Sequence, residues 1–205
     1  AGAKEAEVLF CLDFNALHRI EEVGDLVQDA SGKKVMIDHH LEPEDFDDYR
    51  FWDVSAAATA ELIYDFIISF NEKEAITADI ANCLYAGIMT DTGSFRYGNT
   101  TSKVHRTVAE LIDLGANVNK VSRFIYDTNT INKLRFTGFS LLEKLVVDPK
   151  NNIAYFSISE KDIQHFDLRK GDTEGLVNYA LSIQGIVMAT IIKEGQGEVK
   201  LSFRF

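Results

Sequence analysis

Apolar residues form two short continuous runs near the start of the chain, and each run stops at an aspartate. Residues 8–12 are followed by Asp13, and residues 35–37 are followed by Asp38. Short apolar runs without alternation predict strands buried on both faces, as in a parallel sheet. Residues 19–30 between them suit a helix, or a helix with a loop. The pattern therefore predicts a strand–helix–strand unit.

Helical periodicity takes over after an acidic and aromatic segment, residues 43–53, which we expect to be a loop. Ser55 and Thr77 are expected as N-caps, because their hydroxyl oxygens can accept hydrogen bonds from the first turn of a helix. The predicted helices cover residues 55–70, 77–91, 102–115, 118–126 and 132–145.

The pattern changes at residues 148–152, Asp-Pro-Lys-Asn-Asn, which predict a turn. Beyond it, Ser159 and Asp162 form a capping-box pattern for a short helix, and another helix is expected from Thr173. Gly195-Gln196-Gly197 indicates a hairpin. The strands predicted in this part cover residues 153–159, 186–193 and 198–205.

These elements together predict an α/β fold with two domains. We expect a parallel-sheet domain with flanking helices at residues 1–125, a helical linker at residues 126–146 and a second, smaller α/β domain at residues 147–205. A chain of 205 residues with 46% hydrophobic content can bury the cores that this arrangement needs.

The charge balance narrows the classes of partner. The formal net charge is −11, whereas proteins that hold long nucleic acids usually carry a basic face. Bound cations can still attract a phosphorylated ligand locally, so the charge favours a short ligand over a polymer. There is no apolar run of about 18 residues and no secretory pattern, so we expect no membrane span and a cytoplasmic location. Cys11 and Cys83 are expected to be buried, reduced thiols.

The triplet Asp38-His39-His40 is the strongest chemical signal in the chain. The chain contains five histidines, and two of them are adjacent here, directly after an acid at the end of a predicted buried strand. Imidazole and carboxylate groups together suit Mn, Fe or Zn. Asp13 ends the neighbouring strand, and ligands bind at the carboxyl ends of parallel strands. An exposed polar loop and a simple helix cap at Asp13 are the alternatives.

Asp91 lies in the segment Thr90-Asp91-Thr92-Gly93, followed by further polar groups. Asp-Thr-Gly also occurs in aspartic proteases, where two carboxylates share a proton, but here it follows a helical pattern and has no second copy, which leaves only a homodimer for that reading. Arg96, Asn99 and Thr100 come soon afterwards and suit phosphate binding; an ordinary polar loop is the alternative.

These segments, in this order, resemble the DHH phosphoesterase superfamily, in its oligoribonuclease (nanoRNase) and 3′-phosphoadenosine-5′-phosphate phosphatase branch. The resemblance extends through Thr59-Ala60-Glu61-Leu62 to the last residues and covers almost the whole chain. The segments that carry it are Leu12-Asp13, residues 37–40, residues 86–96, residues 172–178 and residues 201–204.

The resemblance implies a two-domain hydrolase with two Mn²⁺ ions. It implies that Asp13 bridges the metals, that His39 and Asp91 ligate one of them, and that Asp38 and His40 are catalytic residues acting from beside the ligands. Its substrates would be short RNA or DNA oligonucleotides or 3′,5′-bisphosphonucleotides, bound near Arg96, Asn99 and Thr100. A homodimer is compatible with it.

Two family motifs are not found in this sequence. A histidine followed by Asp-x-Asp would precede residue 1, and a Gly-Gly-Gly-His loop would follow residue 205. We therefore expect both domains to be incomplete and this chain alone to bind metal weakly and turn over slowly. The alternatives are a phosphodiesterase of cyclic or linear dinucleotides, a pyrophosphatase, and an inactive nucleotide-binding module.

Overall fold

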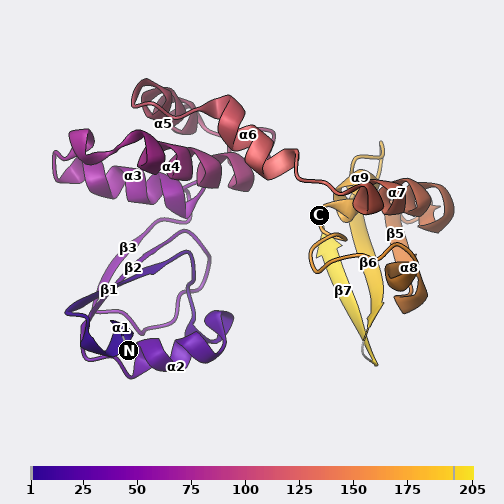
Figure 1. The fold of residues 1–205 in the computed structure, drawn as a ribbon, viewed down its shortest axis with the longest axis horizontal. Helices are drawn as coiled ribbons and strands as arrows, with labels where there is room; N and C mark the ends of the chain where they lie inside the picture. The colour runs from indigo at the N-terminus through magenta and orange to yellow at the C-terminus, as the bar shows by residue number, and fades with distance from the viewer. Residues whose placement is uncertain (1, 196) are drawn as a thin grey trace. The chain divides into compact units, whose positions relative to one another are not determined.

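The computed structural model describes residues 2–195 and 197–205, and the chain divides into two compact units (Figure 1). The first unit ends at Asp127 and the second begins at Thr128. Each unit has its own hydrophobic core. The α/β fold predicted from the sequence is confirmed, whereas the domain boundaries at residues 125 and 146 stay a prediction.

The sheet of the first unit has three parallel strands in the order β1, β2, β3. They are β1 (Val8–Leu12), β2 (Lys33–Asp38) and β3 (Tyr49–Trp52). Leu12 is opposite Ile37 in the register, so β1 and β2 end at the same edge. The crossover between them holds a short 3₁₀ helix η1 (Leu17–Ile20) and α2 (Glu22–Gln28), which confirms the strand–helix–strand unit.

Two features of this sheet differ from the sequence prediction. β1 is not buried on both faces, since Val8, Phe10 and Leu12 are 40–54% exposed; β1 is an edge strand, and the ring of Phe10 contacts the ring of Phe66 edge-on. β3 lies where a loop was expected. All four of its residues are exposed, so its sequence does not show the apolar pattern of a buried strand.

A layer of helices forms the main core of the first unit. In Figure 1, α3 and α4 lie side by side, and α5 and α6 pack against α4. Ile88 and Leu111 are fully buried in this core. The helices of this unit beyond the sheet crossover are α1 (Gly2–Glu5), α3 (Thr59–Ser69), η2 (Lys73–Ala75), α4 (Ala78–Asp91), α5 (Ser102–Asp113) and α6 (Val118–Tyr126).

The start of α3 corrects a predicted cap. Ser55 does not cap this helix, which begins four residues later at Thr59. The Asp53 carboxylate instead accepts hydrogen bonds from the backbone N–H and the hydroxyl of Ser55, at 2.8 and 2.7 Å. This side-chain turn competes with helix formation. Residues 55–58 are consequently a loop, and that loop reaches the candidate site.

The second unit is a four-stranded mixed sheet with helices. Its strand order is β4, β5, β6, β7, with a parallel pair β5–β6 between two antiparallel pairs. Phe136 and Phe156 are fully buried in its core. The elements are α7 (Ile131–Phe139), a π-helical turn η3 (Ser140–Lys144), β4 (Leu145–Asp148), β5 (Ile153–Ile158), α8 (Glu160–His165), α9 (Leu176–Leu181), β6 (Met188–Gly195) and β7 (Glu198–Arg204).

Local signals in this unit were read well from the sequence. The capping box of Ser159 and Asp162 is present, and β6 pairs with β7 as predicted, although Gln196 in the turn lies outside the described residues. β4 was not expected.

Of the two cysteines, Cys11 is buried but Cys83 is exposed, so the prediction was wrong for Cys83. No described helix is long and apolar enough to cross a membrane.

Candidate metal centre

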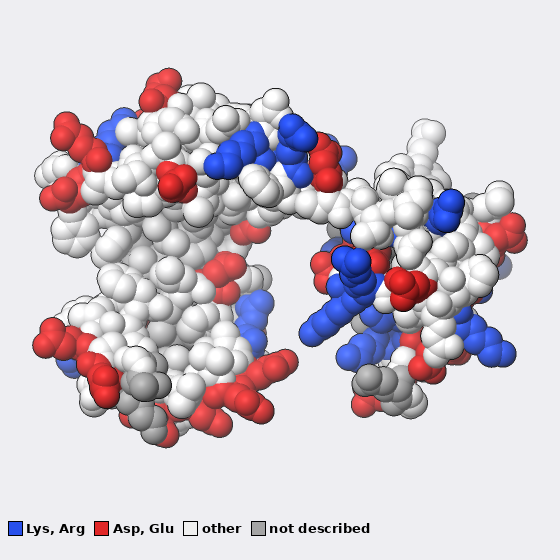
Figure 2. All heavy atoms as spheres, in the orientation of Figure 1, with Lys and Arg blue, Asp and Glu red and all other residues white. Residues whose placement is uncertain are grey.

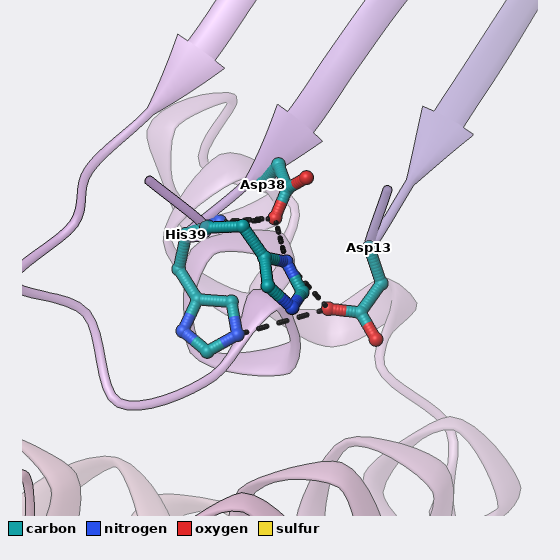
Figure 3. Close-up of side chains that lie close together, drawn as sticks. Asp13, Asp38 and His39 are labelled. Atoms are coloured by element: carbon teal, nitrogen blue, oxygen red, sulfur yellow. Dashed lines mark hydrogen bonds and ion pairs between the residues drawn. The ribbon is translucent and has the colours of Figure 1, made fainter. Parts of the chain in front are cut away.

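The parallel register of β1 and β2 brings Asp13 next to the Asp-His-His triplet. The backbone N–H of Asp13 donates to the carbonyl of Ile37 at 3.2 Å, which continues the ladder one residue past β1. Asp13 then turns sharply, with φ of 65°, a left-handed conformation that is uncommon for a residue with a Cβ. This turn directs the Asp13 carboxylate toward the histidines that follow β2 (Figure 3).

Asp38 is the buried centre of this cluster. Its Oδ1 atom accepts three hydrogen bonds: from the backbone N–H of His39 at 2.6 Å, from the backbone N–H of His40 at 2.9 Å, and from Nδ1 of His40 at 2.7 Å. The side chain is fully buried. Its Oδ2 atom has no hydrogen-bond partner among the described residues. Asp38 therefore fixes the backbone of the triplet and the orientation of the His40 ring.

The ring of His39 is held with its second nitrogen free. Nδ1 lies 3.2 Å from the carbonyl oxygen of Ala56, and a carbonyl only accepts, so Nδ1 carries the proton. Nε2 then presents a lone pair 3.8 Å from Oδ1 of Asp13 and 3.7 Å from Oδ2 of Asp91. Proteins use this arrangement to orient histidines that ligate metals.

The spacing of these donors fits a divalent cation. Ligand bonds from imidazole and carboxylate to Zn²⁺ are about 2.0–2.2 Å long, so two donors of one ion lie up to about 4.2 Å apart. The Nε2 atom of His39 meets this limit with both Asp13 and Asp91. Asp13, Asp38, His39 and His40 also offer donor atoms that all lie within 4.8 Å of one another. The residues present are thus able to hold a metal such as Mn, Fe or Zn.

The charged form of Asp91 is destabilised at this site, and a bound cation would stabilise it. It is the last residue of α4, and its carboxylate lies beside that of Asp13 across His39. Burial raises the pKa of Asp91, the negative charge of Asp13 raises it further, and His39 and His40 oppose the shift. Two carboxylates drawn together around an imidazole nitrogen form a site with excess negative charge.

The loop between β3 and α3, together with the first residue of α3, supports three residues of the site. Thr59 is buried and its hydroxyl donates to Oδ1 of Asp13 at 2.8 Å. The Ala56 carbonyl holds His39, as described above. The Ala57 carbonyl accepts from Nδ2 of Asn99 at 3.2 Å, and the same nitrogen donates to the Asp91 carbonyl at 3.2 Å. This loop was missed in the sequence, where it was assigned to a helix.

Below this loop, the buried carboxylate of Glu61 accepts from the Ala57 N–H at 2.8 Å. Lys103 compensates its charge at 3.3 Å and also pairs with Asp65 at 2.6 Å. A paired carboxylate inside the fold holds the loop backbone in one position. The segment Thr59-Ala60-Glu61-Leu62 is therefore a support for the site.

The predicted phosphate-binding residues are placed unequally. Asn99 uses its amide nitrogen to hold the backbone at Asp91. Arg96 is exposed and donates from Nε to the Gly93 carbonyl at 3.0 Å, and Oγ1 of Thr100 is buried without a partner among the described residues. Within the described part of the chain, no hydrogen bond or ion pair joins Arg96 or Thr100 to the aspartates and histidines.

The loop after Asp91 depends on a glycine. Gly93, Ser94 and Phe95 all have positive φ angles of 56–64°. A Cβ on Gly93 would lie 2.3 Å from the ring of Tyr97, so no other residue fits here without moving that ring. The loop thereby keeps the end of α4 and the backbone of Asp91 in place.

The sequence is similar to a known protein family and to named relatives. Residues 3–88 match the family described as "DHH family, N-terminal domain". The chain is 31% identical over 175 residues to the "Probable bifunctional oligoribonuclease and PAP phosphatase NrnA" of Streptococcus mutans, and the match covers 83% of this chain and 54% of that protein. It is 26% identical over 185 residues to the Bacillus subtilis protein named "Bifunctional oligoribonuclease and PAP phosphatase NrnA", covering 90% and 58%.

A solved structure gives the same fold. The crystal structure of an exopolyphosphatase-related protein from Bacteroides fragilis superposes with a TM-score of 0.95 at 36% identity, covering 98% of this chain and 59% of that one. The chain thus spans little more than half the length of the curated relatives described here, 54% and 58%.

Proposed function

This chain belongs to the DHH family, and we propose on that premise that it is a Mn²⁺-dependent phosphoesterase acting on short oligoribonucleotides, 3′,5′-bisphosphonucleotides or both. The relatives from Streptococcus mutans and Bacillus subtilis carry both activities in their names. Because the chain spans little more than half of each, the activity and the substrates are proposed for the whole gene product.

One observation carries the proposal: Nε2 of His39 faces the carboxylates of Asp13 and Asp91 at 3.7–3.8 Å, while Nδ1 is held by the Ala56 carbonyl. We assign these three residues as metal ligands. A divalent cation such as Mn²⁺ supplies, when bound, charge stabilisation for a phosphoryl group and activation of water.

We assign His40 to contact the substrate and Asp38 to position His40. Oδ1 of Asp38 accepts a hydrogen bond from Nδ1 of His40 at 2.7 Å, and Asp38 is fully buried, so it positions the ring without touching substrate. Nε2 of His40 then presents a lone pair on the exposed side. We assign His40 to hold a proton or accept a hydrogen bond at the phosphate or at the leaving oxygen.

The predicted binding residues receive different roles. Asn99 keeps the Asp91 backbone in place through two hydrogen bonds, which supports a positioning role. Beyond Nε, the guanidinium group of Arg96 has no hydrogen-bond or ion-pair partner among the described residues, and it suits phosphate binding. The hydroxyl of Thr100 is buried, so of the three residues Thr100 has the least structural support for a role in phosphate binding.

The test is hydrolysis by the whole product of the gene that encodes this sequence. We expect release of mononucleotides from a di- to pentaribonucleotide and of phosphate from 3′-phosphoadenosine-5′-phosphate, with Mn²⁺ present and not after chelation. Cyclic dinucleotides and pyrophosphate serve as competing substrates in the same assay. Hydrolysis of only a competing substrate would contradict the assignment. Binding of nucleotides without any turnover would support the inactive nucleotide-binding module instead.

A further inference from the structure

An arginine that no motif marks lies beside the candidate site. Arg19, on η1, is exposed, and its Nη2 atom lies 3.5 Å from Nε2 of His40. Because Nδ1 of His40 donates to Asp38, Nε2 is the accepting nitrogen, and the guanidinium group is a donor that faces it. The contact is long for a hydrogen bond, so the N–H donors of Arg19 remain available to another acceptor.

A second contact holds the guanidinium group in this position. Nη1 of Arg19 donates to Oδ1 of Asn15 at 2.8 Å. Asn15 is 9% exposed, and its amide nitrogen donates to the carbonyls of Leu41 and Glu42, directly after the triplet. The arginine is therefore tied through one buried side chain to the segment that carries His40.

The charge of Arg19 is not neutralised by a carboxylate. Within the described residues, no acidic group forms an ion pair with it, although residues 1–127 contain 23 Asp and Glu. Glu44, the acid that contacts η1, instead accepts from the backbone N–H of Leu17 at 3.2 Å and pairs with His18 at 3.1 Å. An oriented, unpaired guanidinium group next to His40 is suited to bind an anion from outside.

We infer that Arg19 binds a phosphate group of the substrate on the His40 side of the site. This rests on the proposed function and names a residue that recognises the phosphate. A guanidinium fork matches two phosphate oxygens, and one fixed by a neighbour loses less side-chain entropy on binding than a free one. Asn15 is then the positioning residue for Arg19, comparable to Asp38 for His40.

The test is equilibrium binding of adenosine 5′-monophosphate by titration calorimetry, with and without Mn²⁺, and with adenosine as the ligand that lacks the phosphate. Arg19→Ala is expected to weaken monophosphate binding about 10- to 100-fold, because a charge-assisted hydrogen bond is lost. Adenosine binding should not change. Arg19→Lys keeps the charge without the fork and should give an intermediate loss, and Asn15→Ala a smaller one.

Arg106→Ala on α5 is the matched control, since it removes an exposed arginine on another element and should leave binding unchanged. Thermal unfolding checks that each variant folds; if Arg19→Ala does not, Arg19→Lys decides. The inference is overturned if the Arg19 variants bind the monophosphate like the wild type, if monophosphate and adenosine weaken equally, or if the wild type does not bind the monophosphate. Hydrolysis by the wild type is scored separately, so a failure of the proposed function is distinguishable.

Discussion

The two units of the chain differ in their net charge. Residues 1–127 contain 11 Lys and Arg and 23 Asp and Glu, a net charge of −12, whereas residues 128–205 contain 10 and 9, a net charge of +1. Figure 2 shows acidic side chains prevailing on the visible face of the first unit and both signs mixed on the second. The acid excess of the protein therefore belongs entirely to the unit that holds the candidate metal centre.

The difference extends to local structure. In the first unit, Asp13 has a left-handed backbone in a position where the chain leaves a strand. Buried oxygens without a described partner do not separate the units, since Asp38 in the first and Ser140 in the second each have one. In the second unit, the residues with positive φ include Asn152 and Asp167 in turns, where such conformations are ordinary for Asn and Asp. At Asp13 the unusual backbone conformation coincides with the candidate site, as is common for functional residues.

The largest effect should come from removing a proposed metal ligand. His39→Ala deletes the nitrogen that faces both Asp13 and Asp91, so Mn²⁺-dependent hydrolysis by the whole gene product should fall about 1,000-fold or more. Asp91→Ala should do the same. His165→Ala in the second unit is the control and should retain activity. Wild-type turnover in both ligand variants would contradict the metal assignment.

The strand ends of the site were predictable from the sequence, because a short apolar run followed by an acid indicates a strand and its end, although β1 is more exposed than this pattern predicts. β1 and β2, Asp13 and the triplet were found in this way. The helix α6 was predicted with its observed bounds because one face of its sequence is apolar. These features depend on neighbours along the chain.

The supporting residues depend on distant contacts and were not predictable. Thr59 reaches Asp13 across 46 positions, and Arg19 reaches His40 across 21. No local pattern reports such a pair. Ser55 shows a different error. It was predicted to cap α3, but the nearer carboxylate of Asp53 accepts hydrogen bonds from its backbone N–H and its hydroxyl. The residues at the strand ends and Asp91 were thus predicted from the sequence, whereas the residues that support them were seen only in the fold.

A core substitution in the second unit should affect stability strongly. Phe156 is fully buried, and Phe156→Ala leaves a cavity, so the free energy of unfolding should fall by about 3–5 kcal/mol, measured in urea. Phe124→Ala removes the same ring from a side chain that is 70% exposed, and should change it by about 0.5 kcal/mol or less. Equal effects would mean that the burial pattern does not govern stability.

A smaller effect is expected at the support of Asp13. Thr59→Val keeps the shape of the buried side chain but removes the hydroxyl that orients Oδ1 of Asp13. Mn²⁺ affinity, measured by calorimetry, should fall about 10- to 100-fold, as for other groups that orient metal ligands. Thr59→Ser keeps the hydroxyl and should bind metal like the wild type. If Thr59→Val also binds like the wild type, Thr59 does not position Asp13.

The smallest effect should be a gain in stability. The raised pKa of Asp91, from burial and then from Asp13, means that its charged form destabilises the metal-free fold. Asp91→Asn should therefore raise the free energy of unfolding in chelator by about 0.5–1 kcal/mol at neutral pH, a discounted value because the side chain is partly exposed. The gain should shrink as the pH falls through the pKa of Asp91, since the protonated carboxyl is also neutral.

The same substitution should reverse its sign when metal is present. Excess Mn²⁺ stabilises a fold that binds it, and Asp91→Asn removes one proposed ligand, so the variant should then unfold more readily than the wild type. Glu72→Gln, an exposed acid outside the α-helices with no side-chain cap hydrogen bond, should change neither condition. A variant less stable than the wild type in chelator would show that Asp91 holds the fold together. A gain in chelator with a loss in Mn²⁺ would show that its carboxylate is kept for the cation, at a cost to the unit that carries it.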